Sequence, residues 1–186
     1  MRARSLLGLL GALFVVALER DAGAVERQHH VGAAGGLSIL SIDDKSTTSV
    51  GGGGTLHYAY GLSDAFNLMV EGGYAVVALG EDRGGSIPAT RPQSLAHAGA
   101  GVGYVLDVLQ WVPYVGLLGK GYVLEGGSLE KTKLSFGGAL AAGLDFQATR
   151  SFAVGAGVRQ HFLLTDFSTY PSYTEALLRA EFIWGW

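Results

Sequence analysis

The closing stretch of the chain, YTEALLRAEFIWGW (Tyr173–Trp186), alternates between two kinds of side chain. Alternation at every second residue predicts a β-strand, because successive side chains of a strand point to opposite faces. The stretch is longer than most strands of globular proteins, which have roughly five to six residues. It is long enough to cross a bilayer, for which a tilted strand needs roughly nine to eleven residues. Its apolar face carries Ala176, Leu178, Ala180, Phe182, Trp184 and Trp186, and its polar face carries Glu175, Arg179 and Glu181.

Seven earlier segments alternate in the same way, at about residues 31–42, 50–60, 66–76, 94–106, 111–123, 134–146 and 152–164. The register of the fifth segment is ambiguous, and we place Val115, Leu117 and Val123 on the apolar face because this choice turns Lys120 to the polar face. A sheet that crosses lipid has to close, since an open edge leaves backbone groups unpaired. We therefore predict an all-β fold, an eight-stranded antiparallel up-and-down transmembrane β-barrel, whose even strand number suits a single-chain outer-membrane barrel.

The connections between these segments alternate between long and short. In outer-membrane barrels the long loops lie outside the cell and the short turns face the periplasm. The long polar connections span 43–49, 79–93, 125–132 and 165–172, and the short ones span 61–65, 107–110 and 147–151. Aromatic residues suit the membrane interface, and those near the short-turn end are Tyr58, Tyr60, Phe66, Tyr104, Trp111, Phe146, Phe152, Trp184 and Trp186.

The N-terminus has the features of an export signal. It comprises the basic residues Arg2 and Arg4, the apolar run SLLGLLGALFVVAL at 5–18, and an A-x-A cleavage site at Ala22 and Ala24. As a helix the apolar run would rise only about 21 Å, short of a hydrocarbon core of about 30 Å, so a transmembrane helix is disfavoured. We expect residues 1–24 to be a cleaved signal peptide and residues 25–186 to form one outer-membrane β-barrel domain.

The composition excludes several classes of protein. The 186 residues include 30 glycines and no cysteines, 16% of them are charged, and the formal net charge is −3. Without cysteine there is no disulfide framework, thiolate metal site or thiol nucleophile, and the negative charge gives no support for nucleic-acid binding. The scarcity of charge fits an exterior that faces lipid. Glycines on the polar strand faces leave room for long side chains inside a narrow barrel.

Ionisable residues on the polar faces are expected to form a network in the lumen, from Glu71, Lys120, Arg159, Arg179 and Glu181, with Glu175 above them. Because unpaired buried charges are costly, these groups are expected to pair, and we predict that Arg159 contacts at least one of Glu71, Glu175 and Glu181. An eight-stranded barrel is just wide enough for its own side chains, whereas open aqueous pores need roughly sixteen strands. The sequence therefore favours a plugged polar lumen, with a narrow channel for small solutes as an alternative.

The closing pattern Leu178-x-Ala180-x-Phe182-x-Trp184-x-Trp186 resembles the C-terminal insertion signal of outer-membrane proteins, which the barrel-assembly machinery reads. With the YGLSD turn at 60–64 and the VPYVG segment at 112–116, the chain resembles the OmpA/OmpX-like eight-stranded barrels of Gram-negative bacteria. The resemblance implies a place in the cell outer membrane, in contact with its lipids and lipopolysaccharide. Many OmpA proteins carry a peptidoglycan-binding domain after the barrel. Here the chain closes with the eighth strand, so that role is not expected.

Binding through the four outer loops is a candidate function, because loops on a rigid scaffold often carry function. A purely structural role with passive loops is equally compatible with the sequence. The loop charges are mixed in sign and do not identify a ligand: Asp43, Asp44, Glu81, Asp82, Arg83, Glu130, Lys131 and Asp166.

An enzyme that modifies outer-membrane lipids is a second alternative, since some eight-stranded barrels are lipid A deacylases or acyltransferases. The deacylase pattern is His-x-Ser, but Leu163 stands two places after His161. His57 and His97 are expected to be hydrogen-bonded lumen histidines, and the pair at 29–30 lacks a third metal ligand at a recognisable spacing. We predict no catalytic, cofactor or metal site and no enzyme activity.

A soluble periplasmic lipid carrier with a lipocalin-like barrel is a third alternative. Such a barrel has its apolar face inside, and periodicity alone does not tell which face is inside. The scarcity of charge and the aromatic C-terminus favour lipid outside. The glycine series at 99–103 is not a phosphate-binding loop, because it lies within a strand and the pattern GxxxxGK[ST] is missing from the sequence.

Overall fold

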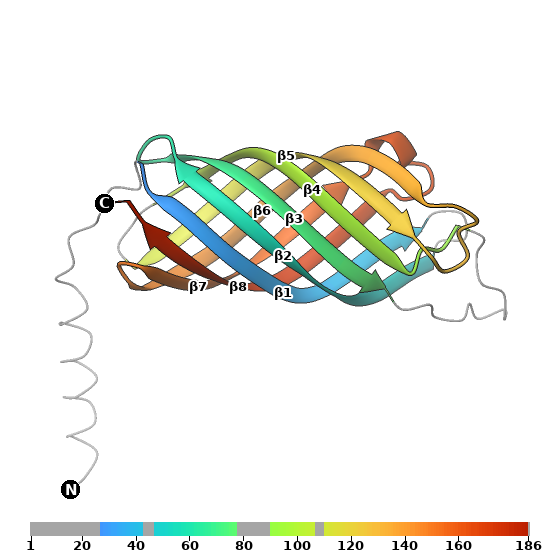
Figure 1. Ribbon diagram of the computed structural model, residues 1–186, viewed down its shortest axis with the longest axis horizontal. Helices are drawn as coiled ribbons and strands as arrows, with labels where there is room; N and C mark the ends of the chain where they lie inside the picture. The colour runs from blue at the N-terminus through green and yellow to red at the C-terminus, as the bar shows by residue number, and fades with distance from the viewer. Residues whose placement is uncertain (1–26, 43–46, 78–89, 107–109, 186) are drawn as a thin grey trace, which may run out of the picture.

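The computed structural model describes residues 27–42, 47–77, 90–106 and 110–185, and its eight strands form one closed antiparallel barrel (Figure 1). Each strand pairs with its neighbours in sequence, and the first pairs with the last. This confirms the predicted fold class. The strands are β1 His29–Ile42, β2 Thr47–Gly61, β3 Phe66–Val77, β4 Ser94–Val105, β5 Trp111–Glu125, β6 Lys133–Thr149, β7 Phe152–Phe162 and β8 Ser172–Trp184.

Several strand ends differ from the predicted limits. β2 begins at Thr47, inside the predicted loop 43–49, because its first residues continue the ladder with the end of β1. β7 ends at Phe162 rather than at 164, because the chain turns into a 3-10 helix at Leu164, while Leu163 keeps the inward direction of His161 and is fully buried. This helix is η2 (Leu164–Asp166). Alternation in sequence thus located the strands, while packing at the outer end decided where they stop.

Side chains alternate between an apolar exterior and a polar or small-residue interior. Lys120 is buried while Val115 and Leu117 are exposed, so the register chosen for β5 is correct. The inward glycines allow close approach of neighbouring strands: a Cβ on Gly36 would overlap the carbonyl oxygen of Ala176 on β8. This polarity is the reverse of that in a lipid carrier with an apolar cavity.

β1 begins and β8 ends at the same rim, where His29 lies beside Trp184 in the ladder (Figure 1). The short turns lie at this rim, and the connections 126–132 and 163–171 lie at the other. At the turn after β2, the hydroxyl of Ser63 accepts a hydrogen bond from the amide of Phe66 (3.2 Å). We refer to the two ends as the short-turn rim and the outer rim.

Within the described ranges, no helix is both long and apolar enough to cross a membrane.

Some sequence predictions concern residues outside the described ranges. These are residues 1–24 with the expected cleavage site at Ala22 and Ala24, the last residue Trp186, and most of the connections 43–49, 79–93 and 107–110.

Candidate functional site

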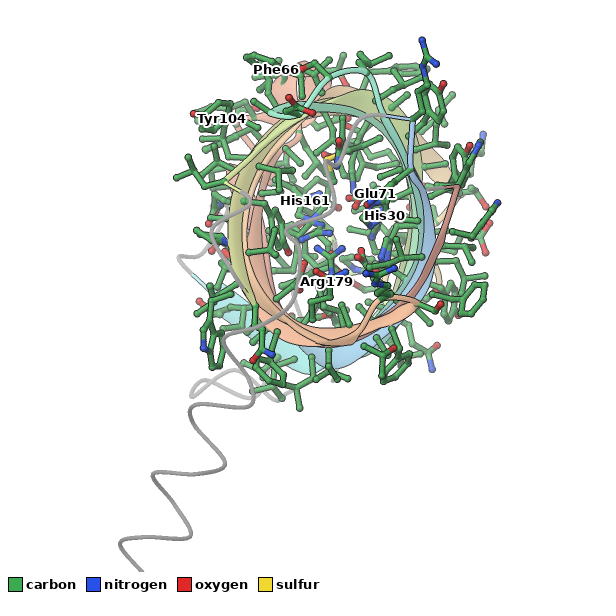
Figure 2. All side chains as sticks on the ribbon, turned by 90° about the vertical axis from the view of Figure 1, so that its left-hand side faces the viewer. His30, Phe66, Glu71, Tyr104, His161 and Arg179 are labelled. Carbon is green, nitrogen blue, oxygen red and sulfur yellow. The ribbon has the colours of Figure 1, made fainter. Side chains whose placement is uncertain are left out.

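Side chains from all eight strands project into the lumen (Figure 2). The ionisable ones lie at three levels along the barrel axis. Counted from the short-turn rim, we call them the lower cluster (His30, His57, Asp145, Arg179, Glu181), the middle cluster (Glu71, Lys120, Arg159) and the upper cluster (His97, His161, Glu175).

The middle cluster is centred on Glu71 of β3. Its Oε1 lies 2.5 Å from Nζ of Lys120, and its Oε2 lies 3.0 Å from Nε of Arg159. Arg159 also donates from a terminal nitrogen to the hydroxyl of Tyr114 at 3.4 Å. The three charged side chains are at most 1% exposed. The expected contact of Arg159 with a carboxylate is therefore present, and it crosses the lumen from β7 to β3.

The upper cluster is centred on Glu175 of β8. Its Oε2 lies 3.0 Å from Nε2 of His161 and 3.5 Å from Nε2 of His97, and all three side chains are fully buried. Its Oε1 accepts a hydrogen bond of 2.8 Å from the hydroxyl of Tyr173. Lys120 links this cluster to the middle one, because its Nζ lies 3.1 Å from Nδ1 of His97. The two clusters therefore form one connected network.

The lower cluster is centred on Glu181, which pairs with Arg179 two residues before it on β8. His57 Nε2 lies 2.7 Å from Oε1 of Glu181, and His30 Nδ1 lies 3.3 Å from its Oε2. Nε of Arg179 lies 3.4 Å from Oδ1 of Asp145, on β6. The guanidinium also lies over the ring of Tyr114, which contacts the middle cluster as well.

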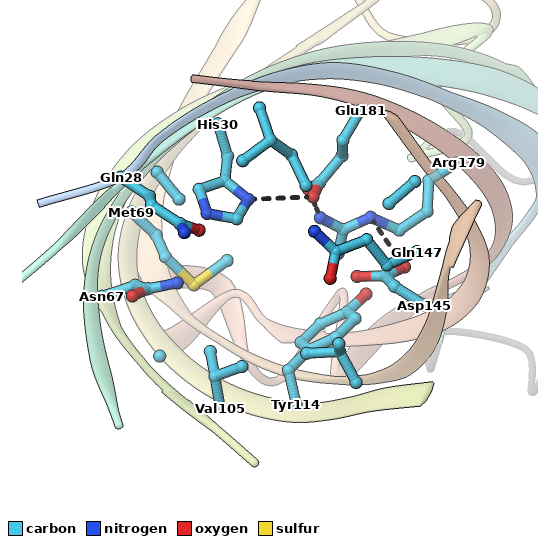
Figure 3. A pocket seen from close by; sticks show the side chains of 15 residues that line it. Gln28, His30, Asn67, Met69, Val105, Tyr114, Asp145, Gln147, Arg179 and Glu181 are labelled. Carbon is cyan, nitrogen blue, oxygen red and sulfur yellow. Dashed lines mark hydrogen bonds and ion pairs between the residues drawn. The ribbon is translucent and has the colours of Figure 1, made fainter. Parts of the chain in front are cut away.

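A cavity of about 60 Å³ lies below the lower cluster, towards the short-turn rim (Figure 3). Gln28, Asn67 and Met69 line one side of it, and Arg179 and Asp145 line the other. A water molecule needs roughly 10–15 Å³ of such space, so the cavity has room for a few waters but not for a large ligand.

Apolar side chains gather at the outer end of the lumen. We call this group the apolar cap, and its buried members are Leu40, Ile42, Ala75, Val77, Leu95, Tyr122, Leu124, Leu163, Tyr170 and Tyr173. Arg91 is also buried at this end, where its Nε donates to the hydroxyl of Ser49 at 2.8 Å. Ordered residues from two connections therefore pack over the upper cluster.

An ion pair connects η2 to the beginning of β6 at the outer rim. Lys133 Nζ lies 2.7 Å from Oδ1 of Asp166. Burial by itself would raise the pKa of Asp166, but hydrogen bonds from Lys133, Ser135 and Thr165 outweigh it and hold this pKa below its usual value. The connection between β7 and β8 is thereby fixed to the barrel wall.

The structure places the six sequence-predicted lumen residues inside the barrel, but not all in one group. Arg159 lies opposite Glu175 in the β7–β8 ladder, yet its guanidinium pairs with Glu71. Glu175 instead contacts the two histidines of the upper cluster. The members of the C-terminal pattern that can be described, Leu178, Ala180, Phe182 and Trp184, are exposed on the barrel exterior.

The sequence analysis did not place Asp145 or His30 in the network, and it did not anticipate that His97 and His161 share one carboxylate. Each of these side chains faces the lumen by simple alternation, so its inward direction could be predicted from the sequence. The missing information was the relative height of the strands. Arg91 gave no signal at all, because it lies in a stretch predicted as a polar loop.

Aromatic side chains encircle the short-turn rim on the outside. Phe66 packs against Tyr104 and Trp111 against Phe146, with ring centroids 5.3 and 4.9 Å apart. Phe66 and Tyr104 project outward in Figure 2. Rings at this height suit the headgroup region of a membrane.

Comparison with known proteins gives the same class of molecule. The family described as "Outer membrane protein beta-barrel domain" matches residues 8–178. No curated protein matches the chain.

Solved structures with a similar fold are outer-membrane barrels. Neisserial surface protein A (NspA) has a TM-score of 0.64 at 16% identity, over 83% of this chain and 96% of that one. Ail, the attachment invasion locus protein of Yersinia pestis, has a TM-score of 0.56 at 13% identity, over 86% and 99%. The N-terminal β-barrel domain of Pseudomonas aeruginosa OprF has a TM-score of 0.57 at 14% identity, over 86% and 98%. At these identities the likeness concerns the fold.

Proposed function

Since this chain belongs to the outer membrane protein beta-barrel domain family, we propose that it is a small barrel whose lumen is closed to solutes and whose contacts with other molecules are made by its outer loops. Its role is structural or adhesive, and it is not an enzyme or an open channel. Its location in the outer membrane follows from the family and from an exterior of exposed apolar residues.

The observation that carries the closed lumen is the continuous column of paired side chains. The middle cluster joins the upper one through Lys120 and joins the lower one through Tyr114. Above this column, the apolar cap contains side chains such as Leu95 and Leu124 that are fully buried. Water and ions would have to separate both layers in order to pass.

Conductance of the refolded barrel in a planar lipid bilayer tests this proposal. We expect insertion without a sustained current at physiological salt, with a known porin as the control for the bilayer. A stable single-channel current from the unmodified chain would contradict the closed lumen and favour the narrow channel.

The support for contacts through the loops is that described residues at the outer rim are held to the barrel wall. Arg91 is anchored to the barrel wall by Ser49, and η2 is fixed by the Lys133–Asp166 pair. Loops held on a rigid scaffold are suited to binding. Among the neighbours, Ail has been solved in complex with the heparin analogue sucrose octasulfate.

Removal of residues 80–90 tests the loop role. Cells that display the intact chain or the shortened one are compared for adsorption to immobilised heparin and to uncoated surfaces. We expect the deletion to reduce adsorption while the barrel still folds, as measured by its heat-dependent gel mobility. Equal adsorption by both chains would remove this loop from the proposed binding surface.

The absence of enzyme activity is proposed from the partners of the lumen histidines. His161 contacts Glu175 and Tyr122, His97 contacts Glu175 and Lys120, and these partners are not serine or threonine nucleophiles. A catalytic serine would need to lie within hydrogen-bond reach of its base. Incubation of the purified barrel with lipid A, followed by mass spectrometry, should leave the acyl chains intact. Loss or gain of an acyl chain would refute this part of the proposal.

A further inference from the structure

Three potential metal ligands from separate strands meet in the upper cluster: His97 of β4, His161 of β7 and Glu175 of β8. We propose that this site holds one divalent transition-metal ion, Zn²⁺ or a metal of similar preference, through Nε2 of both histidines and Oε2 of the glutamate. The ligand atoms lie within 4.8 Å of one another. This inference goes beyond the closed lumen and does not depend on it.

The distances between the donor atoms fit a bound ion. Zinc takes nitrogen and carboxylate oxygen at about 2.0–2.2 Å in tetrahedral geometry, which sets neighbouring donor atoms about 3.3 Å apart. Oε2 of Glu175 lies 3.0 Å from Nε2 of His161 and 3.5 Å from Nε2 of His97. Shifts of a few tenths of an ångström therefore suffice at the two pairs that include Glu175, while the two histidine nitrogens, which lie within 4.8 Å of each other, close around the ion. Two imidazoles and one carboxylate also form the ligand set of known zinc sites.

A second observation points into the same site. Nε2 of His97 is a fully buried polar atom that has no hydrogen-bond partner. It is directed at Glu175 from a distance too long for a good hydrogen bond. Buried nitrogen atoms of this kind normally find a partner, and a metal ion between His97 and Glu175 supplies one.

The surroundings of His161 provide an acceptor for the Nδ1 hydrogen that a metal-bound histidine carries. The hydroxyl of Tyr122 lies 3.1 Å from the carbonyl oxygen of Gly138 and 3.3 Å from Nδ1 of His161. A tyrosine hydroxyl has one hydrogen, so donation to Gly138 leaves its oxygen free to accept from Nδ1–H. In the metal-free site the 3.0 Å contact of Nε2 with the carboxylate of Glu175 places the hydrogen on Nε2, because a carboxylate only accepts. Metal binding at Nε2 moves this hydrogen to Nδ1, where the hydroxyl of Tyr122 accepts it. A metal-bound histidine typically donates its other N–H to a neighbouring acceptor in this way.

The surroundings of Glu175 fix its orientation. Tyr173 donates to Oε1 at 2.8 Å, which leaves Oε2 for the two histidines. Ligating carboxylates are commonly held by such hydrogen bonds. Tyr173 belongs to the apolar cap as well, so the site is covered on its outer side. An ion would therefore enter while the barrel folds, and would then connect β4 to β7 and β8 on the facing wall.

Lys120 opposes binding at His97 and provides a test. Its ammonium group is a donor only, so its 3.1 Å contact requires Nδ1 of His97 to accept and favours the hydrogen on Nε2. Metal binding at His97 therefore requires this hydrogen to move to Nδ1 and the ammonium group of Lys120 to turn to Glu71 alone, which lowers the affinity of the unmodified chain. In Lys120→Gln the side-chain amide oxygen can accept from Nδ1–H, which frees Nε2 for the metal. We expect this variant to bind Zn²⁺ about tenfold more tightly than the unmodified chain, in line with other groups that orient metal-bound histidines.

The experiment is metal loading of the full chain during refolding. The chain is refolded in detergent with equimolar Zn²⁺ and freed of excess metal, and its metal content is measured by mass spectrometry. We expect about one ion per chain, and about a tenth of that or less in His161→Gln and Glu175→Gln, because loss of a ligand destroys such a site. His57→Gln is the matched control, since it removes another buried lumen histidine that pairs with a glutamate.

A spectroscopic measurement on the unmodified chain keeps the proposal testable if the ligand variants fail to fold. Refolding with Co²⁺ in place of Zn²⁺ should give the intense visible absorption of four-coordinate cobalt. The weak spectrum of six-coordinate cobalt would indicate ions held loosely at the surface and would overturn the proposal. Metal content that is near zero in the unmodified chain, or that is equal in His161→Gln, would overturn it as well.

Discussion

Replacing Glu71 by glutamine is expected to destabilise the barrel strongly. Glutamine keeps the size of the side chain but removes the charge that pairs with Lys120 at 2.5 Å and with Arg159 at 3.0 Å. Both cations are at most 1% exposed, so water does not replace the lost partner. The change therefore leaves two buried positive charges beside one neutral amide.

The expected cost follows from these contacts. Removing one partner of a buried ion pair typically costs about 3–5 kcal/mol, because the other charge stays buried without compensation. Arg159 keeps its 3.4 Å contact with Tyr114, and Lys120 keeps its 3.1 Å contact with His97, which limits the loss although two cations are affected. We therefore expect about 3–5 kcal/mol, or a fall of roughly two to three and a half orders of magnitude in the folding equilibrium constant.

Urea titration of the refolded barrel in detergent, followed by tryptophan fluorescence, measures this free energy. The triple variant Glu71→Leu, Lys120→Met, Arg159→Leu removes all three charges together. It therefore shows whether the destabilisation in Glu71→Gln comes from the two cations that are left without a partner. Because replacing a whole buried ion cluster by apolar residues is often neutral or stabilising, we expect the triple variant to recover most of the stability lost in Glu71→Gln. A Glu71→Gln barrel within about 1 kcal/mol of the unmodified chain, at an unchanged urea dependence, would refute the reasoning.

Three further predictions use the same titration. Gly36→Ala should lower the free energy of unfolding by about 1–3 kcal/mol, because its Cβ would overlap a carbonyl oxygen of β8. The control Gly35→Ala, whose Cβ points outward, should be neutral or stabilising by up to about 1 kcal/mol. Equal effects of the two substitutions would contradict the observed packing. Leu117→Arg should cost about 2–4 kcal/mol in lipid vesicles, because this exposed residue lies in the middle of β5, and no cost would place it outside the hydrocarbon region. The low folded-state pKa of Asp166 means that its pairing with Lys133 stabilises the barrel above pH 3.8 and is lost as the pH falls through the folded value. Asp166→Asn should therefore cost at most about 1 kcal/mol at pH 7 and progressively less below pH 3.8, and a difference that grows in acid would contradict this sign.

The directions of the lumen side chains could be read from the sequence because alternation in a strand is strict. Lys120 was predicted to point inward because a charge is costly in lipid, and its side chain is buried in the lumen. The partners were harder to predict, because they depend on the stagger of the strands around the barrel. Arg159 and Glu175 are neighbours in the ladder, yet each pairs with a residue from another strand.

The ends of the barrel were predicted least well. The long connections read as polar loops, but Arg91 is buried there and Tyr170, from the predicted loop 165–172, belongs to the apolar cap. Period-two patterning says nothing about residues that leave the ladder. The apolar cap is therefore formed by tertiary packing between segments far apart in the sequence.

The lumen contacts join opposite walls of the barrel, and this bears on why the sheet closes at eight strands. Glu71 of β3 pairs with Arg159 of β7, and His97 of β4 lies within 3.5 Å of Glu175 of β8, so both pairs join strands that are four apart in the ring. The diameter of a barrel grows with its strand number. A wider ring would separate these side chains and leave their charges buried without partners. Since buried ion pairs add little net stability, we infer that this network serves mainly to select the narrow closed barrel over wider or open sheets of the same strands.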